Sequence, residues 1–235
     1  MKTGSFLKRG LFIGAACAAL FVAPVSQAGT LTINSYSPNE TIGIHGVQNE
    51  SVYAGTFTGK FDTIDPIYFW CIDLFHNINV PSGPLAYTAQ DWDTQPLFSP
   101  TVKTELETLF HYAFASGSPP LPITTAHVAA VFQVAIWDIL YDNDHNLSTW
   151  GASSGFGVDA GSTNNDAQAL VDAVVKGPAF AFPLTELVSN AGTQNFITPR
   201  LPRLVPEPTG LALLGAGLVA MMFTMRRRKI GGHAV

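Results

Sequence analysis

Charged residues are scarce in this chain of 235 residues: they make up 12% of it, against 47% hydrophobic residues. About a quarter is usual for a soluble domain. Aromatic and aliphatic residues are too abundant for an intrinsically disordered protein. Between the two ends, no stretch reaches the roughly 18 uncharged apolar residues of a membrane-spanning helix, which excludes a protein with several spans. The length predicts one domain with short appendages.

Basic residues are nearly absent from the interior of the chain. Only five of the 12 Lys and Arg residues lie between residues 10 and 225. All 17 acidic residues lie in that stretch, which gives it a net charge of −12. Nucleic acids are bound by basic surfaces, so this balance argues against a nucleic-acid partner.

Residues 1–28 predict a secretory signal peptide. A basic start that includes Lys8 and Arg9 precedes a short apolar core, residues 11–22, and small residues at 26–28 suit cleavage. A retained membrane anchor is the alternative, although the apolar run is shorter than the roughly 20 residues that span a bilayer. Lipidation at Cys17 is a second alternative, but the residues before Cys17 lack the usual large apolar side chain.

The C-terminal residues 205–235 contain three parts in a fixed order. Val205, Pro206, Glu207 and Pro208 come first, an apolar run over 210–225 follows, and Arg226, Arg227, Arg228 and Lys229 close the segment. A basic cluster of this kind stays on the cytoplasmic side of a membrane. A plain single-span anchor would also fit these parts.

This order of parts resembles the PEP-CTERM sorting signal of Gram-negative bacteria that make exopolysaccharide. The resemblance implies export across the inner membrane and recognition of the segment by a membrane-embedded exosortase. It also implies a transient or stable membrane-anchored stage, followed by a place at the cell surface or in the extracellular matrix.

The body, residues 29–204, predicts an α+β fold: a mainly antiparallel β framework with an inserted three-helix subdomain. A signal helix and a transmembrane-like helix flank it. The predicted strands cover Leu31–Asn34, Thr41–Ile44, Val52–Phe57, Ile67–Phe75, Ala181–Val188 and Gln194–Ile197. The predicted helices cover Thr101–Ala115, Thr125–Tyr141 and Asp166–Lys176, and the predicted loops cover Pro81–Pro100 and 151–165.

Two residues of the body are unusual for their surroundings. Cys71 is the single cysteine left after signal cleavage, in a compartment where cysteines normally pair. Gln133 lies on an apolar stripe of its predicted helix, where its amide must find hydrogen-bond partners. Taken alone, each residue could serve packing only.

Together these two residues resemble the paired motifs of the bacterial thioester domain, known from Gram-positive adhesins. The motif residues are Phe69, Trp70, Cys71 and Ile72, then Phe132, Gln133, Ala135, Ile136 and Trp137. The resemblance, over residues 50–175, implies an internal bond between the Cys71 sulfur and the Gln133 side-chain carbonyl. Trp70 departs from the usual residue, and the C-terminal segment differs from a Gram-positive wall anchor. It further implies adhesin-like, single-turnover coupling to an amine on a surface or matrix component.

Two alternatives stay open. The body is a passive structural or binding component of the exopolysaccharide matrix, or a secreted enzyme that uses Cys71 as its nucleophile. The thioester reading predicts no enzymatic turnover and no cofactor. No metal is predicted either, because the oxygen-rich stretch Asp142–Asn146 has Leu147 where a calcium loop has glycine, and the six histidines lack metal-ligand spacing.

Overall fold

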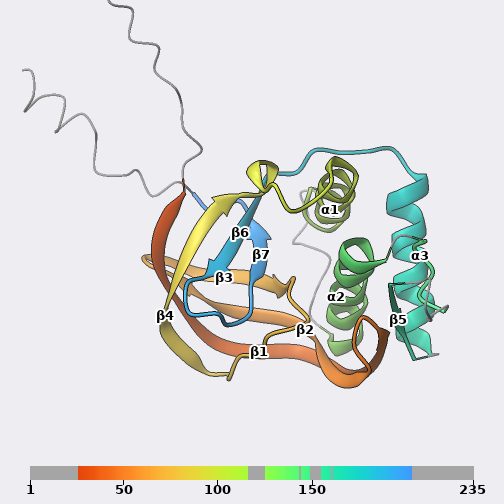
Figure 1. Cartoon of the computed structure of the whole chain (residues 1–235), viewed down its shortest axis with the longest axis horizontal. Helices are drawn as coiled ribbons and strands as arrows, with labels where there is room; N and C mark the ends of the chain where they lie inside the picture. The colour runs from red at the N-terminus through yellow and green to blue at the C-terminus, as the bar shows by residue number, and fades with distance from the viewer. Residues whose placement is uncertain (1–25, 116–124, 143, 149–154, 160, 203–235) are drawn as a thin grey trace, which may run out of the picture.

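The fold is taken from a computed structural model that describes residues 26–115, 125–142, 144–148, 155–159 and 161–202 (Figure 1). The predicted sorting segment and basic tail, and all but the last three residues of the predicted signal peptide, lie outside these ranges. The elements in chain order are β1 (Gln27–Gly46), β2 (Glu50–Phe61), β3 (Ile64–Cys71), β4 (Ser82–Asp91), η1 (Trp92–Thr94), α1 (Pro100–Phe114), α2 (Ala126–Tyr141), β5 (Phe156–Val158), α3 (Ser162–Lys176), β6 (Leu184–Ser189) and β7 (Phe196–Pro199).

The strands form one antiparallel sheet of order β2-β3-β7-β6-β4-β1-β5, and β1 also pairs with β2. The pairing of six strands therefore runs in a closed ring. The length of β1 makes this possible, because its first part, Gln27–Ile33, pairs with β4 while Leu31–Ile44 pairs with β2. Its last residues, Ile44–Gly46, pair with β5.

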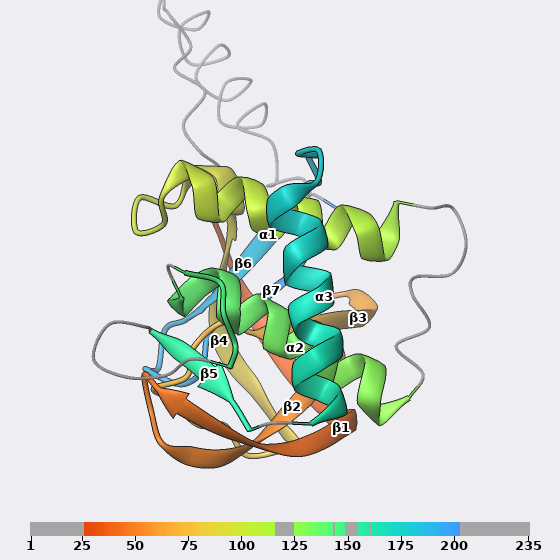
Figure 2. The ribbon, with the colours of Figure 1, turned by 90° about the vertical axis from the view of Figure 1, so that its right-hand side faces the viewer.

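The helices lie together on one side of the six strands of the ring, and β5 lies beside α3 (Figure 1). Helix α2 is between the sheet and α3, and it contacts β1, β2, α1 and α3. Seen from the helical side, α3 crosses in front of α2 (Figure 2). The central position of α2 follows from its sequence, which is apolar on nearly every side and has ten buried residues.

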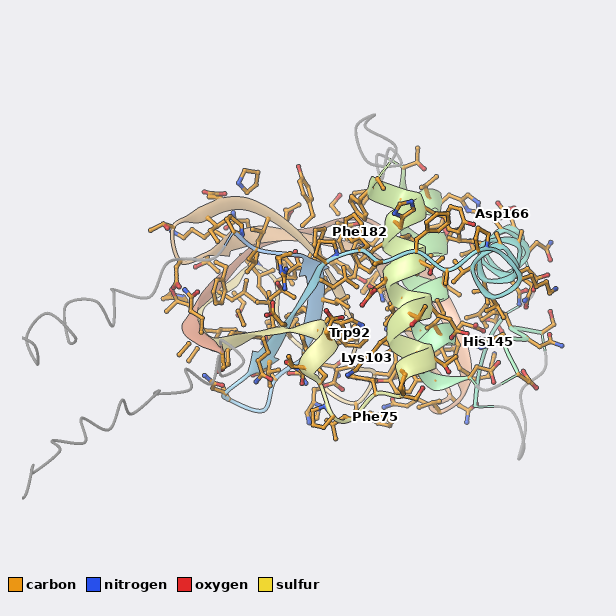
Figure 3. All side chains as sticks on the ribbon, turned by 90° about the horizontal axis from the view of Figure 1, so that it is seen from above. Phe75, Trp92, Lys103, His145, Asp166 and Phe182 are labelled. Atoms are coloured by element: carbon orange, nitrogen blue, oxygen red, sulfur yellow. The ribbon has the colours of Figure 1, made fainter. Side chains whose placement is uncertain are left out.

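Side chains set where the helices begin. Ser99 and Thr125 cap α1 and α2: each side-chain oxygen accepts a hydrogen bond, at 3.2 Å, from the backbone N–H three residues later. Pro100 occupies the first turn of α1, where its missing N–H costs nothing. At the entrance to α1, Trp92 Nε1 donates to the carbonyl of Lys103 at 3.5 Å, and Figure 3 shows the two residues side by side.

Two buried hydrophobic clusters fill the molecule. The first cluster contains the alternate strand residues of one face, including Phe57, Phe69, Cys71 and Phe196, together with Trp137 of α2. The second cluster contains residues of the opposite strand face, including Trp70, with the apolar residues of α1 and α2 and two of α3. Alternation along β3 therefore sends Cys71 and Trp70 to different clusters.

The predicted antiparallel framework with three helices is confirmed. Four details differ. The segments predicted as strands at Leu31–Asn34 and Thr41–Ile44 are parts of the single strand β1. The predicted loops Pro81–Pro100 and 151–165 contain β4 and β5. The strand predicted to reach Phe75 ends at Cys71, and α3 begins at Ser162 rather than Asp166.

Within the described ranges, no helix is long and apolar enough to cross a membrane. The predicted signal helix and the predicted C-terminal membrane helix lie outside those ranges.

Candidate functional site

The structure brings Cys71 and Gln133 together in the interior. Gln133 Oε1 accepts a hydrogen bond from the backbone N–H of Cys71 at 3.0 Å, and Gln133 Nε2 donates to the Cys71 carbonyl at 2.8 Å. Gln133 has no solvent exposure, and Cys71 has 1%. The side-chain amide that the sequence places on an apolar helix stripe thus has both of its polar groups satisfied by one residue.

This pairing follows from where the strands end. Strand β2 pairs with β3 as far as Phe69, and no residue of β2 pairs with Cys71. On the other edge, Cys71 lies opposite Phe196 of β7. The Cys71 backbone groups that face away from β7 would be left buried and unpaired. The amide of Gln133 has the same donor and acceptor as a peptide group, and it continues the ladder at this point.

The Cys71 sulfur lies among N–H donors. Gln194 Nε2 donates to Sγ at 2.7 Å, and the backbone N–H of Asp73 lies 3.3 Å from it. The thiol itself donates to the Asp73 carbonyl at 3.1 Å. Trp137 Nε1 makes no hydrogen bond of standard geometry, yet it is close enough to lower the pKa of the thiol. These groups are arranged to receive negative charge on sulfur.

Burial works against that charge. Loss of solvent raises the pKa of the Cys71 thiol to about 12, and this effect outweighs the lowering by the backbone of Asp73, by Trp137 and by Gln194. At neutral pH the sulfur is therefore a thiol rather than a thiolate.

The remaining motif residues are divided between the two buried clusters: Phe69 and Trp137 lie in the cluster that contains Cys71, and the other five lie in the second cluster. Trp70 and Phe132 meet edge to face with ring centroids 5.2 Å apart, and Phe69 stacks on Phe57 at 5.5 Å. Each of the seven motif residues is at most 4% exposed: Phe69, Trp70, Ile72, Phe132, Ala135, Ile136 and Trp137. The predicted apolar residues are thus all buried, and Phe69 and Trp137 share a cluster with Cys71.

A cavity of about 260 Å³ reaches Cys71 from the surface. Its walls come from β1, from the start of β2 and from the loop after β3, and they include Trp137 and Gln194. The ionisable residues on the walls are Tyr36, Glu50, Tyr53, Cys71, Asp73 and His76, and no Lys or Arg is among them. A water molecule occupies about 30 Å³ in the liquid, so the end of a small amine fits.

The exposed aromatic residues Tyr53 and Phe75 lie close to this cavity. Tyr53 is 61% exposed and is one of the wall residues. Phe75 is 59% exposed, packs edge to face on Tyr141, and projects from the margin of the molecule in Figure 3. Large apolar side chains at the mouth of a cavity are typical of a contact surface.

The oxygen-rich stretch after α2 has a structural role. Asp142 accepts hydrogen bonds from the backbone N–H groups of Asp144, Asn146 and Gly155, which closes the turn at the helix end. Nearby, His145 Nδ1 contacts Oδ2 of the buried Asp138 at 3.0 Å. Among the described residues, no group of three His, Cys, Asp or Glu is placed to hold a metal ion.

Sequence reasoning missed Gln194, Asp73 and His76. Gln194 belongs to the turn between β6 and β7, and it lies 123 positions from Cys71. Its neighbours in the sequence are polar, so nothing local distinguishes it from an ordinary turn residue. Asp73 was expected on a strand; the end of β3 at Cys71 instead places it in the loop, next to the sulfur.

Comparisons with known proteins give two kinds of match. Residues 204–229 match the PEP-CTERM protein-sorting motif. Two solved structures from Streptococcus pyogenes are similar: the N-terminal thioester domain of the fibronectin-binding protein SfbI and the N-terminal domain of the pilus tip adhesin Cpa. No curated protein sequence matches the chain.

Both structural likenesses are distant. The SfbI domain has 12% identity and a TM-score of 0.41, over 73% of this chain and 98% of its own length. The Cpa domain has 12% identity and a TM-score of 0.40, over 63% of this chain and 85% of its own. The motif at residues 204–229 marks the chain as an exported, surface-sorted protein that exosortase-type machinery processes.

Proposed function

We propose that this protein is a surface or exopolysaccharide-matrix protein of a Gram-negative bacterium, in which Cys71 and Gln133 form an internal thioester. The thioester couples the protein once to an amine on a surface or matrix partner. The observation that carries the proposal is the reciprocal pairing of the Gln133 amide with the Cys71 backbone in a buried site.

The bond would form without a cofactor. The Cys71 sulfur attacks the side-chain carbonyl carbon of Gln133, the C–N bond breaks, and the thiol proton leaves with the nitrogen as ammonia. The Cys71 N–H already bonds Oε1 at 3.0 Å, so it is in place to stabilise negative charge on that oxygen during the attack. Holding two groups in reactive orientation can lower a barrier by about 7–11 kcal/mol.

Two features of the site suit a bond that must last. Burial keeps bulk water from the acyl group, since Gln133 has no exposure and Cys71 has 1%. The cavity gives access to Cys71 from one side. An amine that enters there attacks the acyl carbon, an amide bond forms to Gln133, and the sulfur leaves and regains a proton. Each molecule reacts once.

A passive role is the second candidate. Both polar groups of the Gln133 amide are satisfied by Cys71, and that pairing alone explains a buried glutamine as a support for the end of β3. On this reading, the protein is a structural or binding component of the matrix with no covalent chemistry.

The mass of the intact protein separates the two candidates. A thioester makes the chain lighter than its sequence mass by one ammonia and blocks alkylation of Cys71 in the denatured protein. The Cys71→Ala variant, which has no thiol at this position, is expected to keep its full mass. A wild-type chain of full mass with a freely alkylated Cys71 would refute the covalent proposal and leave the passive one.

Methylamine then locates the acyl group. We expect one methylamine per chain, attached to residue 133 after peptide mapping, with release of the Cys71 thiol. The mapping is necessary because Gln194 Nε2 is also close to the sulfur, at 2.7 Å. Methylamine at residue 194 would mean that the thioester forms between Cys71 and Gln194, and it would refute the role proposed for Gln133.

A further inference from the structure

The loop after β3 carries a histidine–carboxylate pair on the wall of the Cys71 cavity. His76 Nδ1 lies 2.7 Å from Asp73 Oδ2. The other oxygen of Asp73, Oδ1, accepts the backbone N–H of Phe75 at 2.9 Å. The carboxylate is therefore held between the loop backbone and the imidazole. Its side chain is 12% exposed, while that of His76 is 51% exposed.

This arrangement selects one form of the imidazole. A carboxylate oxygen only accepts hydrogen bonds, so Nδ1 of His76 carries the proton of their contact. In the neutral ring, Nε2 is then the nitrogen with a free lone pair. A histidine oriented by a carboxylate in this way is suited to take up a proton from a neighbouring group.

The coupling chemistry of the proposed function needs such a group. An amine that attacks a carbonyl must lose a proton from its nitrogen, and the sulfur that departs must gain one. The pKa of the Cys71 thiol is raised by burial, so its thiolate is a poor leaving group without a proton. A base that receives the first proton and returns it to the sulfur serves both ends of the step.

We propose that His76, oriented by Asp73, is the proton carrier for attack of an amine on the Cys71–Gln133 thioester. Nε2 takes a proton from the attacking nitrogen as the C–N bond forms, and it gives that proton to Cys71 Sγ as the C–S bond breaks. Asp73 is a positioning residue, because it acts through His76. The proposal rests on the thioester of the proposed function.

The other ionisable groups that line the cavity with His76 come from its own loop and from three strands. They are Asp73 on its own loop, Tyr36 from β1, Glu50 and Tyr53 from β2, and Cys71 at the end of β3. Glu50 and Asp73 are acidic, and no basic side chain of the wall competes for the incoming proton. His76 and the Cys71 sulfur, between which the proton would pass, therefore line the same cavity.

The test measures the rate at which methylamine releases the Cys71 thiol, in the full chain, between pH 5 and 8. The wild type is compared with His76→Gln, and the ratio of their rates at each pH cancels the ionisation of methylamine itself. We expect the wild type to be faster by about 100-fold at pH 8, within the usual range for general base catalysis. The ratio should fall as the pH is lowered, because a protonated imidazole has no lone pair with which to accept a proton.

Two further variants sharpen the result. Asp73→Asn keeps an oxygen for the Phe75 N–H but removes the charge that orients His76, so we expect a smaller loss of rate that follows the same pH dependence. His111→Gln is the matched control, because His111 lies on α1, stacks on Phe180 at 4.2 Å and is not a cavity residue. Its rates should equal those of the wild type throughout.

The mass loss of one ammonia, recorded before methylamine is added, keeps the two proposals apart. If the wild type shows no loss, the thioester proposal fails and this inference fails with it. If all chains show the loss and His76→Gln reacts as fast as the wild type, only the role of His76 is refuted. A rate ratio that is large but independent of pH, or a His76→Gln chain that forms no thioester, assigns His76 a structural role and overturns the inference.

Discussion

Tyr141 donates its hydroxyl proton to the carbonyl of Ile72 at 2.8 Å. The same hydroxyl lies 3.4 Å from the backbone N–H of Leu74. Tyr141 is on α2, two turns after Gln133, which bonds the backbone of Cys71. Helix α2 therefore holds the end of β3 and the following loop at two points. The segment that carries the sulfur is fixed relative to the helix that carries the amide.

Removal of the Tyr141 hydroxyl tests this two-point attachment. We expect Tyr141→Phe to lower the free energy of unfolding by about 1 kcal/mol, the usual net value of one hydrogen bond. The fraction of chains that lose ammonia should also fall, because residues 72–74 are held less firmly. Urea denaturation and intact mass measure the two effects. The control is Tyr68→Phe, on the exposed side of β3, which should change neither.

Gln133→Ala should destabilise the protein as well as abolish coupling. The reference is Cys71→Ala, in which no thioester forms and the Gln133 amide is retained. In that background the truncation leaves the N–H and the carbonyl of residue 71 buried without partners, and each such group costs about 1–3 kcal/mol. We expect a loss of about 2–6 kcal/mol in urea denaturation. Gln95→Ala is the control, because the side chain of Gln95 is also buried but its described hydrogen bond is to another side chain, that of Gln90, rather than to the backbone. Equal losses in the two variants would contradict the role of Gln133 at the strand end.

Gln194 should control how fast the thioester reacts rather than where it forms. Its Nε2–H is placed to stabilise the negative charge that develops on the sulfur before it is protonated, and a hydrogen bond to a charged group contributes about 1.5–3 kcal/mol. Gln194→Ala should therefore release thiol to methylamine at least about tenfold more slowly. Gln194→Glu, with a carboxylate against the sulfur, should be slower still. Unchanged rates in both variants would show that Gln194 only packs.

Glu186 predicts a dependence of stability on pH. Burial raises its pKa from 4.5 to about 7, and its Oε2 has no hydrogen-bond partner. The folded chain thus holds the proton that the unfolded chain releases, so the stabilising contribution is complete below pH 4.5 and is lost as the pH rises through 7. Glu186→Gln should be more stable than the wild type by about 1–3 kcal/mol at pH 8.

The internal control is the same comparison at pH 4, where both chains carry a neutral side chain at position 186. Chemical denaturation at the two pH values should give equal stabilities at pH 4. If the stability difference between the wild type and Glu186→Gln were the same at pH 4 and pH 8, ionisation of Glu186 would not be its cause.

Local sequence signals were sufficient for the helices. Ser99 followed by Pro100 and the nearly continuous apolar run after Thr125 place the starts of α1 and α2 to within a residue, because capping and burial are local or periodic properties. The start of α3 was predicted four residues late. The residue before the helix, Gly161, has no side chain that could cap it, so the sequence has no capping signal at this helix start.

The strands depend more on their partners. A loop was predicted over Pro81–Pro100, where prolines and a glycine occur at residues 81–84. Strand β4 forms in this segment because β1 and β6 supply hydrogen bonds on its two edges. The alternation of Leu85, Tyr87 and Ala89 was the signal available for this strand. In β1, shifts of register at Ile33/Ser35 and Tyr36/Asn39 carry the strand past Pro38, where the sequence predicted a break.

The site shows the same division. Two short motifs, residues 69–72 and 132–137, were enough to identify Cys71 and Gln133 as candidates. Gln194 and His76 could be identified only from the structure. They line the same cavity as Cys71 because the fold brings the turn before β7 and the loop after β3 together.

Strand β1 pairs with β4 through its first residues and with β2 over most of its length, so each of the six strands in the ring has a partner on both sides over at least part of its length. Exposed strand edges are where β proteins join one another into aggregates. Ring closure leaves shorter free edges than an open sheet of the same strands would have, which lowers the tendency of crowded copies of an exported chain to join through their strands.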